Sequence, residues 1–159
     1  MNLIVNKSQG DNWEIVGIID FEDATYGYKV YDIGNYIMYM MSIADNSMDI
    51  GGYCLQGFMQ NCKLSQRELD LLYYCVCARF VLSMVLGLYY YSVTKDPYTL
   101  ITQRGWKVFK KLWELPAHEA IAYWTSEKFE LSCRSMWKYT SQKVTQKIFT
   151  RLNFAIEKS

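Results

Sequence analysis

The segment from Leu71 to Val93 limits the folds open to this chain more than any other part of the sequence. Its 23 residues carry a single charge, that of Arg79. By length and composition the segment qualifies as a membrane-spanning helix. A central helix that is buried on most of its sides explains the same run of apolar residues.

Three observations favour the core helix. Arg79 falls near the middle of the segment, where a charge is expensive in a bilayer. The segment carries five tyrosine hydroxyls, and no basic cluster flanks its ends. Independently of that choice, Ser65 and Glu68 have the spacing of a capping box, which predicts a helix from Gln66 to about Val93. We therefore expect no membrane contact and a buried acid from the N-terminal region as the partner of Arg79. A membrane-anchored helical protein stays the less favoured alternative.

Two short β-type runs open the chain, Leu3–Val5 and Trp13–Ile19, with a polar turn between them. This pattern predicts a β-hairpin. Because one hairpin alone is marginal in water, we expect it to lie against helices.

Helical periodicity follows the hairpin and predicts helices over residues 29–44, 50–60, 66–93 and 97–115, with a shorter one up to residue 124. In the fourth helix the expected core face is Leu100, Trp106, Phe109 and Leu112. The predicted fold class is α+β, mostly α: a β-hairpin followed by an antiparallel array of helices.

The pattern weakens after residue 124, and the charge balance changes there. Residues 1–124 hold 10 Lys/Arg against 13 Asp/Glu, whereas residues 125–159 hold 7 against 3. We therefore divide the chain into a domain, residues 1–124, and a divergent basic tail, residues 125–159. In the tail Val144, Ile148, Leu152 and Ile156 recur every four residues, as in a terminal helix.

The totals exclude several classes of function. A net charge of +1 argues against nucleic-acid binding. Five cysteines, an odd number without paired spacing, and one histidine give no zinc-finger pattern. Thiols in a reducing compartment explain these cysteines, and no signal peptide is visible, so we expect a cytoplasmic protein.

Asn2 and Asp20 are the candidate metal ligands. Asn2 opens the first strand and Asp20 follows the second, so a hairpin would bring an amide oxygen and a carboxylate together. Oxygen ligands of this kind suit Mg²⁺, which also binds substrate phosphates. A frayed terminus at Asn2 and a turn residue at Asp20 stay open as the simpler interpretation.

Two motifs carry a resemblance to a known family, Ile18-Ile-Asp-Phe-Glu-Asp-Ala24 and Tyr31-Asp-Ile-Gly34, with Tyr26-Gly27 between them. They resemble the aminoglycoside phosphotransferase and choline kinase family, which contains small-molecule kinases with a protein-kinase-like fold. Later stretches resemble the hydroxylysine kinase branch of that family: Gly51-Gly52, Gly57-Phe58, Cys77-Ala-Arg-Phe80 and Gly105-Trp-Lys107. The resemblance covers about residues 1–124 and implies the C-terminal lobe of such a kinase.

The family's catalytic loop reads His-x-Asp-x-x-x-x-Asn, and its last position matches Asn2. The catalytic Asp would then lie upstream of Met1, as would the nucleotide-binding lobe, so the resemblance assigns no catalytic residue to this chain. It assigns Mg²⁺ to Asn2 and Asp20, with Glu22 or Asp23 as an additional contact. It also matches Asp32 to a helix-borne acid that braces the catalytic loop; the simpler interpretation is an acid favoured by the helix dipole.

The resemblance implies a reaction in which GTP (or ATP) phosphorylates 5-hydroxy-L-lysine or a similar hydroxy-amine. Because the chain lacks the catalytic Asp and the nucleotide lobe, we expect it to be inactive alone. Tyr28, Tyr90 and Trp106 are candidates for the substrate pocket, although such aromatic residues are more often core. The alternative function is a non-catalytic interaction module, which would bind a partner or a second copy over the exposed face of the lobe.

Overall fold

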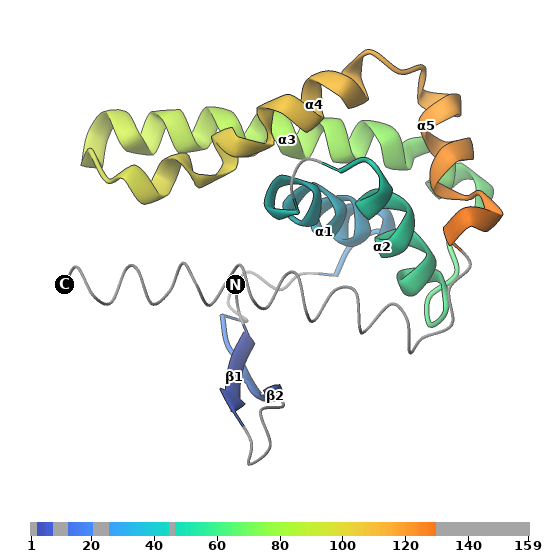
Figure 1. Ribbon diagram of the computed structural model, residues 1–159, viewed down its shortest axis with the longest axis horizontal. Helices are drawn as coiled ribbons and strands as arrows, with labels where there is room; N and C mark the ends of the chain where they lie inside the picture. The colour runs from blue at the N-terminus through green and yellow to red at the C-terminus, as the bar shows by residue number, and fades with distance from the viewer. Residues whose placement is uncertain (1–2, 8–12, 21–25, 45–46, 130–159) are drawn as a thin grey trace.

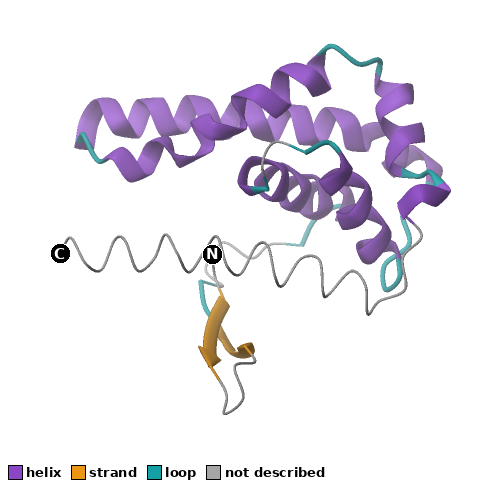
Figure 2. Cartoon of the chain, viewed as in Figure 1, coloured by secondary structure: helices purple, strands orange, loops and turns teal. Residues whose placement is uncertain are grey.

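The structure is a computed structural model, and it describes residues 3–7, 13–20, 26–44 and 47–129. The expected fold class is confirmed, because a two-stranded hairpin is followed by a body made of helices (Figures 1 and 2). The predicted helix of the tail and Cys133 lie outside the described residues.

The hairpin consists of β1 (Leu3–Lys7) and β2 (Trp13–Ile18), paired antiparallel. Leu3 pairs with Ile18, and the register shifts by one residue inside the hairpin. Because Ile4 pairs with Gly17 while Val5 pairs with Ile15, Val16 is the extra residue of a β-bulge.

The expected packing of the hairpin against the helices is wrong. Figure 1 shows the hairpin below the helical body, and its apolar side chains are 37% to 58% exposed. These side chains are Ile4, Val5, Ile15, Val16, Ile18 and Ile19. Strands that are apolar on both faces are typical of a sheet covered from both sides. The described helices bury their own apolar faces against one another and do not provide such a cover.

α1 (Lys29–Ile43) and α2 (Asp49–Met59) begin and end within one residue of the predicted helices. α1 packs closely against the long helix α3 (Gln66–Thr94) at Gly34. A β-carbon at Gly34 would stand 3.0 Å from the β-carbon of Cys75, so a larger residue there would force the two helices a few tenths of an ångström apart.

α3 begins at the predicted capping box. The Glu68 carboxylate accepts from the Ser65 backbone N–H at 2.9 Å, and the Glu68 N–H donates to the Ser65 hydroxyl at 3.3 Å. The first half of α3 is the core helix that the sequence predicts, whereas its second half exposes apolar side chains from Val81 onward. Among the described residues α3 is the helix long and apolar enough to cross a bilayer, and 39% of its most apolar stretch is buried.

The chain then turns back along α3. It forms the 3₁₀-helix η1 (Pro97–Gly105) and the α-helix α4 (Trp106–Trp113). Asp96 caps η1, as its carboxylate accepts from the Tyr98 N–H at 2.9 Å. The prediction of one continuous α-helix is wrong here, because the β-branched residues of the segment 99–102 disfavour an α-helix. The predicted core face is also wrong at Trp106, which is half exposed. Val108 is buried in its place, together with Phe109 and Leu112.

α5 (Ala117–Trp124) and the short 3₁₀-helix η2 (Glu127–Phe129) close the body against α2. The Trp124 indole N–H donates to the backbone oxygen of Met48 at 3.0 Å. Phe129 is completely buried. The packed body therefore extends to Phe129, whereas the division at residue 124 assigned residues 125–129 to the tail.

Two glycines of α2 make room for these rings. A β-carbon at Gly51 would stand 2.4 Å from the Trp124 ring, and one at Gly52 would stand 2.5 Å from the Phe129 ring. Glycine lowers helix propensity, and here close packing against α5 and η2 explains its presence inside a helix.

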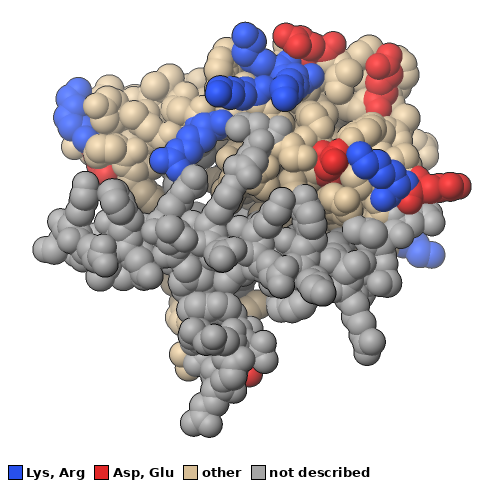
Figure 3. Space-filling model, viewed as in Figure 1, with Lys and Arg blue, Asp and Glu red and all other residues tan. Residues whose placement is uncertain are grey.

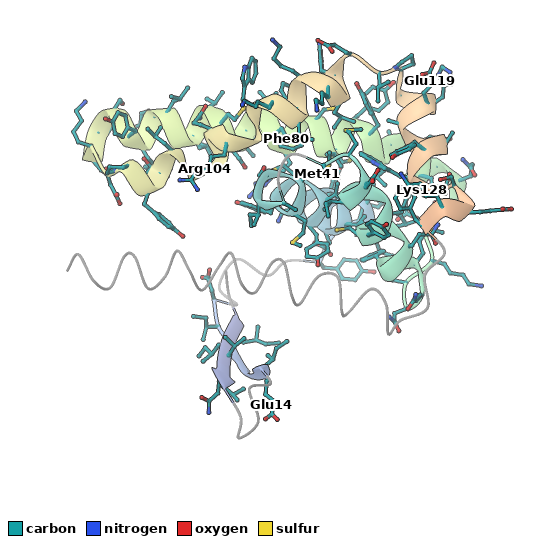
Figure 4. The ribbon with its side chains drawn as sticks, viewed as in Figure 1. Glu14, Met41, Phe80, Arg104, Glu119 and Lys128 are labelled. Carbon is teal, nitrogen blue, oxygen red and sulfur yellow. The ribbon has the colours of Figure 1, made fainter. Side chains whose placement is uncertain are left out.

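One hydrophobic core joins the five α-helices, and Figure 4 labels two of its members, Met41 and Phe80. The largest completely buried side chains are Ile33, Ile37, Met38, Met41, Leu55, Leu72, Val76, Phe80, Val108, Leu112, Trp124 and Phe129. This core fixes α1 and α3, which carry the polar residues discussed next.

Candidate functional site

Asp20 has an unusual backbone conformation. Its φ angle is 68°, in the left-handed region, and its side chain is exposed. Asp enters this region more readily than most residues, because its short polar side chain can hydrogen-bond locally. Backbone strain of this kind concentrates at functional sites. Lys95, the residue that follows α3, also has a left-handed φ of 58°, so the backbone angle alone does not separate a functional Asp20 from a turn residue.

The strand register bears on the predicted pairing of Asn2 with Asp20. Leu3 pairs with Ile18, so the chain enters β1 and leaves β2 at the same end of the hairpin. Asn2, Glu22 and Asp23 lie outside the described residues. Their contacts with a metal ion remain a prediction.

Asp20 fits a magnesium site as one oxygen ligand, because its exposed carboxylate is the hard donor that Mg²⁺ prefers. In protein sites the ion usually keeps several waters and binds one or two carboxylates together with substrate phosphates. In the described ranges no point is surrounded by three or more His, Cys, Asp or Glu side chains. Asp20 would hold the ion, and the second protein oxygen is the one predicted at Asn2.

Asp32 lies in the first turn of α1 and is exposed. Its position suits the positive end of the helix dipole. Tyr28, the N-cap residue of α1, provides no side-chain hydrogen bond to the helix start. The bracing role of Asp32 remains a prediction, because the catalytic loop that it would brace is not among the described residues.

The three candidate pocket aromatics do not converge. Tyr28 stacks edge-on against Tyr31 with 6.0 Å between ring centres, and Tyr90 is half exposed near the end of α3. Only Trp106 lines a concave surface. We call this surface the α3–η1 groove; it has a volume of about 480 Å³. Its lining residues are Val81, Met84, Val85, Leu88, Gln103, Trp106 and Phe109.

The α3–η1 groove is almost entirely apolar. Gln103 is its polar lining residue, and the amide of Gln103 donates to the backbone oxygen of Met84 at 2.8 Å. Figure 3 shows few charged side chains on the visible face of the projecting end of α3 and η1. A surface of this kind suits an apolar partner better than a charged acceptor.

Arg79 is placed differently from the sequence-based expectation. Its Nη2 donates to the Tyr39 hydroxyl at 3.3 Å, and its guanidinium carbon stands 5.7 Å from the centre of the Tyr39 ring. No acid forms an ion pair with Arg79 among the described residues, so the expected acidic partner is wrong within them. In the sequence, Tyr39 is one of several tyrosines in and next to α1. Their spacing does not distinguish Tyr39 from the others as the partner of Arg79.

The remaining polar cluster of the body joins α2 to η2. The Lys128 ammonium lies 3.0 Å from the Asp49 carboxylate and 2.8 Å from the Tyr123 hydroxyl, which also donates to Asp49. Figure 4 labels Lys128 at this end of the body. The hydrogen bond from Tyr123 is the main reason that the pKa of Asp49 is lowered. The three side chains use their hydrogen bonds on one another, which identifies a structural cluster that fastens η2.

Comparison with known proteins agrees with this layout. Residues 1–56, which contain the hairpin, Asp20 and α1, match the model of the "phosphotransferase enzyme family". The hydroxylysine kinase of Mus musculus is 33% identical over 138 residues, which cover 81% of this chain and 37% of that protein. The hydroxylysine kinase of Danio rerio is 35% identical over 128 residues, covering 77% of this chain and 36% of that protein.

The chain thus spans little more than a third of the length of the relatives that it matches. No solved structure matches it. Several residues of the matched segment have a packing role in this structure, among them Gly51, Gly52 and Gly105. The chain belongs to the phosphotransferase enzyme family and is similar to hydroxylysine kinases.

Proposed function

We propose that the chain provides the metal-binding and acceptor-binding part of a small-molecule kinase. The reaction transfers the terminal phosphoryl group of GTP (or ATP) to the hydroxyl of 5-hydroxy-L-lysine or a similar hydroxy-amine. The observation that carries the proposal is the similarity to hydroxylysine kinases over about four fifths of the chain, together with the family match over residues 1–56, which contain Asp20.

In this proposal the chain contributes two magnesium ligands, Asn2 and Asp20. Bound Mg²⁺ would neutralise charge on the transferring phosphates, which is the main electrostatic requirement of phosphoryl transfer. Asp32 would brace the catalytic loop from α1. The catalytic Asp and the nucleotide-binding lobe would come from polypeptide outside residues 1–159. The isolated chain therefore lacks a complete active site, and we expect it not to catalyse the reaction.

The apolar surfaces of the structure support a role for additional polypeptide. The hairpin is apolar on both faces, and the α3–η1 groove is apolar along its length. The relatives contain more than half of their length outside the matched region. We propose that the remaining part of the kinase, including the nucleotide-binding lobe, covers these two surfaces. A membrane or a nucleic acid is the less favoured cover.

A transfer assay tests the proposal. The chain is incubated with Mg²⁺, radiolabelled GTP and 5-hydroxy-L-lysine, alone and after co-expression with the part of the Mus musculus relative that the chain does not match. We expect no transfer by the chain alone and transfer by the complex. Asp20→Asn should remove transfer by the complex, whereas Glu14→Gln, on the same hairpin, should leave it unchanged. Transfer by the chain alone would refute the expected inactivity.

The second candidate function is a non-catalytic interaction module, which the same exposed apolar surfaces favour. Size-exclusion chromatography with light scattering separates the two proposals. A module of this kind associates with itself or captures a partner without any dependence on Asp20. Four described cysteines, Cys54, Cys62, Cys75 and Cys77, are free thiols, and we propose a cytoplasmic location for either function.

A further inference from the structure

The α3–η1 groove is an apolar surface that the described residues leave open. Val81, Val85 and Leu88 of α3 line it and are about half exposed, as is Trp106 of α4. Figure 1 shows the second half of α3 and η1 projecting beyond the other helices. An exposed apolar surface of this kind usually marks a place where another segment binds.

The exposed side of α3 presents a regular row of apolar side chains, which we call the α3 ridge. Its members recur at every fourth position and are 45% to 66% exposed: Val81, Val85, Tyr89 and Val93. Residues four apart form ridges on a helix surface, and such ridges on two helices pack into each other's grooves in the commonest class of helix packing. The α3 ridge is therefore shaped to receive a second helix with the same spacing.

The tail of this chain contains a row with that spacing, which we call the tail stripe. Its members lie outside the described residues: Val144, Ile148, Leu152 and Ile156. From its first residue to its last, each row spans about 18 Å of helix. The two rows thus agree in spacing, in length and in apolar character.

The tail is long enough to bring its stripe to the groove. Phe129 is buried at the end of the described body, and the 14 residues 130–143 separate it from Val144. Fully extended, they span about 45 Å, whereas the 29 residues of α3 measure about 43 Å. Attachment to the same chain also keeps the stripe at an effective concentration on the order of millimolar.

The charges permit one orientation of such a helix. Exposed cations lie on the α4 side of the groove: Lys107, Lys110 and Lys111. On the α3 side, residues 80–94 carry no charge. In the tail one flank of the stripe is cationic, with Lys143, Lys147 and Arg151, and the other flank is uncharged, with Thr145, Phe149 and Asn153. With the uncharged flank toward α4, the two sets of cations stay apart.

We propose that residues 144–156 form a helix whose apolar stripe packs along the α3 ridge and covers the α3–η1 groove in the isolated chain. A second copy is a poorer occupant, because it would bring a second set of α4 lysines to the same surface. The remaining part of the kinase would then displace the tail to reach the groove. The proposal concerns this chain alone and does not depend on the kinase function.

Photo-cross-linking of the full chain tests this contact. Val81 in the groove is replaced by the photo-reactive amino acid p-benzoyl-L-phenylalanine, and the products are mapped by mass spectrometry of digests. We expect cross-links to residues 144–156 of the same molecule, with a yield that does not change on dilution. The matched control is the same replacement at Leu71, which is equally exposed on α3 but outside the groove and should give no such cross-link.

Two tail variants test the apolar stripe itself. Ile148→Asp combined with Leu152→Asp should abolish the cross-link and increase the fluorescence of 8-anilinonaphthalene-1-sulfonate, a dye that binds exposed apolar surface. Phe154→Asp lies on the opposite side of the predicted helix and should behave as the wild type in both assays. Thermal unfolding followed by circular dichroism should show the same folded body in all of these proteins.

Four results would overturn the proposal. The first is a cross-link between two molecules, which a mixture of ¹⁵N-labelled and unlabelled chain reveals, and the second is a cross-link to added vesicles of phosphatidylcholine and phosphatidylserine in place of the tail. The third is an equal yield from Leu71, and the fourth is a cross-link that survives Ile148→Asp with Leu152→Asp. None of them bears on the kinase proposal, which depends on phosphoryl transfer that requires Asp20.

Discussion

Gly52→Ala is the sharpest test of how η2 packs on α2, because Gly52 and Phe129 are far apart in the sequence and in direct contact in the fold. A β-carbon at Gly52 would lie 2.5 Å from Cδ2 of Phe129, well inside van der Waals contact. The Phe129 ring cannot easily move away. It is completely buried and packs edge-on against Tyr53 and Tyr123, with ring centres 5.0 Å and 5.4 Å away.

Two opposing terms set the magnitude. Overpacking a close contact of this kind costs about 1–3 kcal/mol. Replacing glycine by alanine inside a helix stabilises the folded state by about 0.5–1 kcal/mol. The overpacking term is the larger one, so Gly52→Ala should lower the free energy of unfolding by about 1–2 kcal/mol. Without the phenylalanine ring the clash disappears, and the same substitution should stabilise the protein.

Urea unfolding followed by far-UV circular dichroism measures both effects. Phe129→Ala alone should cost about 3–5 kcal/mol, and in that background Gly52→Ala should add about 0.5–1 kcal/mol of stability. The coupling between the two sites is then about 1.5–3 kcal/mol. Gly27→Ala is the control for the absence of a clash, because nothing lies within 4 Å of the added carbon. If Gly52→Ala has the same effect in both backgrounds, η2 does not pack on α2.

Three further predictions concern the rest of the molecule. Burial raises the pKa of Cys54 to about 12 and that of Cys77 to about 11, so both thiols should resist iodoacetamide at neutral pH and react only after unfolding, as mass spectrometry of digests can show. The hydrogen bond from Tyr123 lowers the pKa of Asp49, so its stabilising contact with Lys128 should be complete above about pH 5 and lost in acid, below the unfolded pKa of about 3.9. In urea melts at a series of pH values the small advantage of the wild type over Asp49→Asn should disappear on acidification, and an advantage that persists at low pH would contradict the assignment. Carbonate extraction of expressing cells should leave the chain in the supernatant, and recovery in the membrane pellet would favour α3 as a span.

The sequence predicted the helices well where a local signal marked their ends. The capping box at Ser65 gave the start of α3, and Pro116 gave the break before α5. The sequence gives no local reason for Gly51 and Gly52 inside α2, because the rings that require them, Trp124 and Phe129, lie more than 70 residues away. Contacts at that separation leave no periodic pattern in the sequence.

The candidate site was predictable in part. The apolar strand ending in an acid identified Asp20, and the structure adds its left-handed backbone, which sequence spacing does not encode. Arg79 was recognised as a charge in need of a partner, but its neighbour Tyr39 follows only from how α1 meets α3. The exposure of the hairpin was not predicted. Strands that are apolar on both faces indicate burial, but their sequence does not show which surface would cover them.

A chimeric enzyme tests the central claim most directly. In it, the part of the Mus musculus hydroxylysine kinase that matches this chain is replaced by the corresponding residues of this chain, and phosphoryl transfer from GTP to 5-hydroxy-L-lysine is measured. The account predicts transfer that requires Mg²⁺ and falls by a factor of about 10² or more in Asp20→Asn, as when a group that stabilises transition-state charge is removed. A chimera that unfolds cooperatively but transfers no phosphate, or one that transfers equally well with Asp20→Asn, would contradict it.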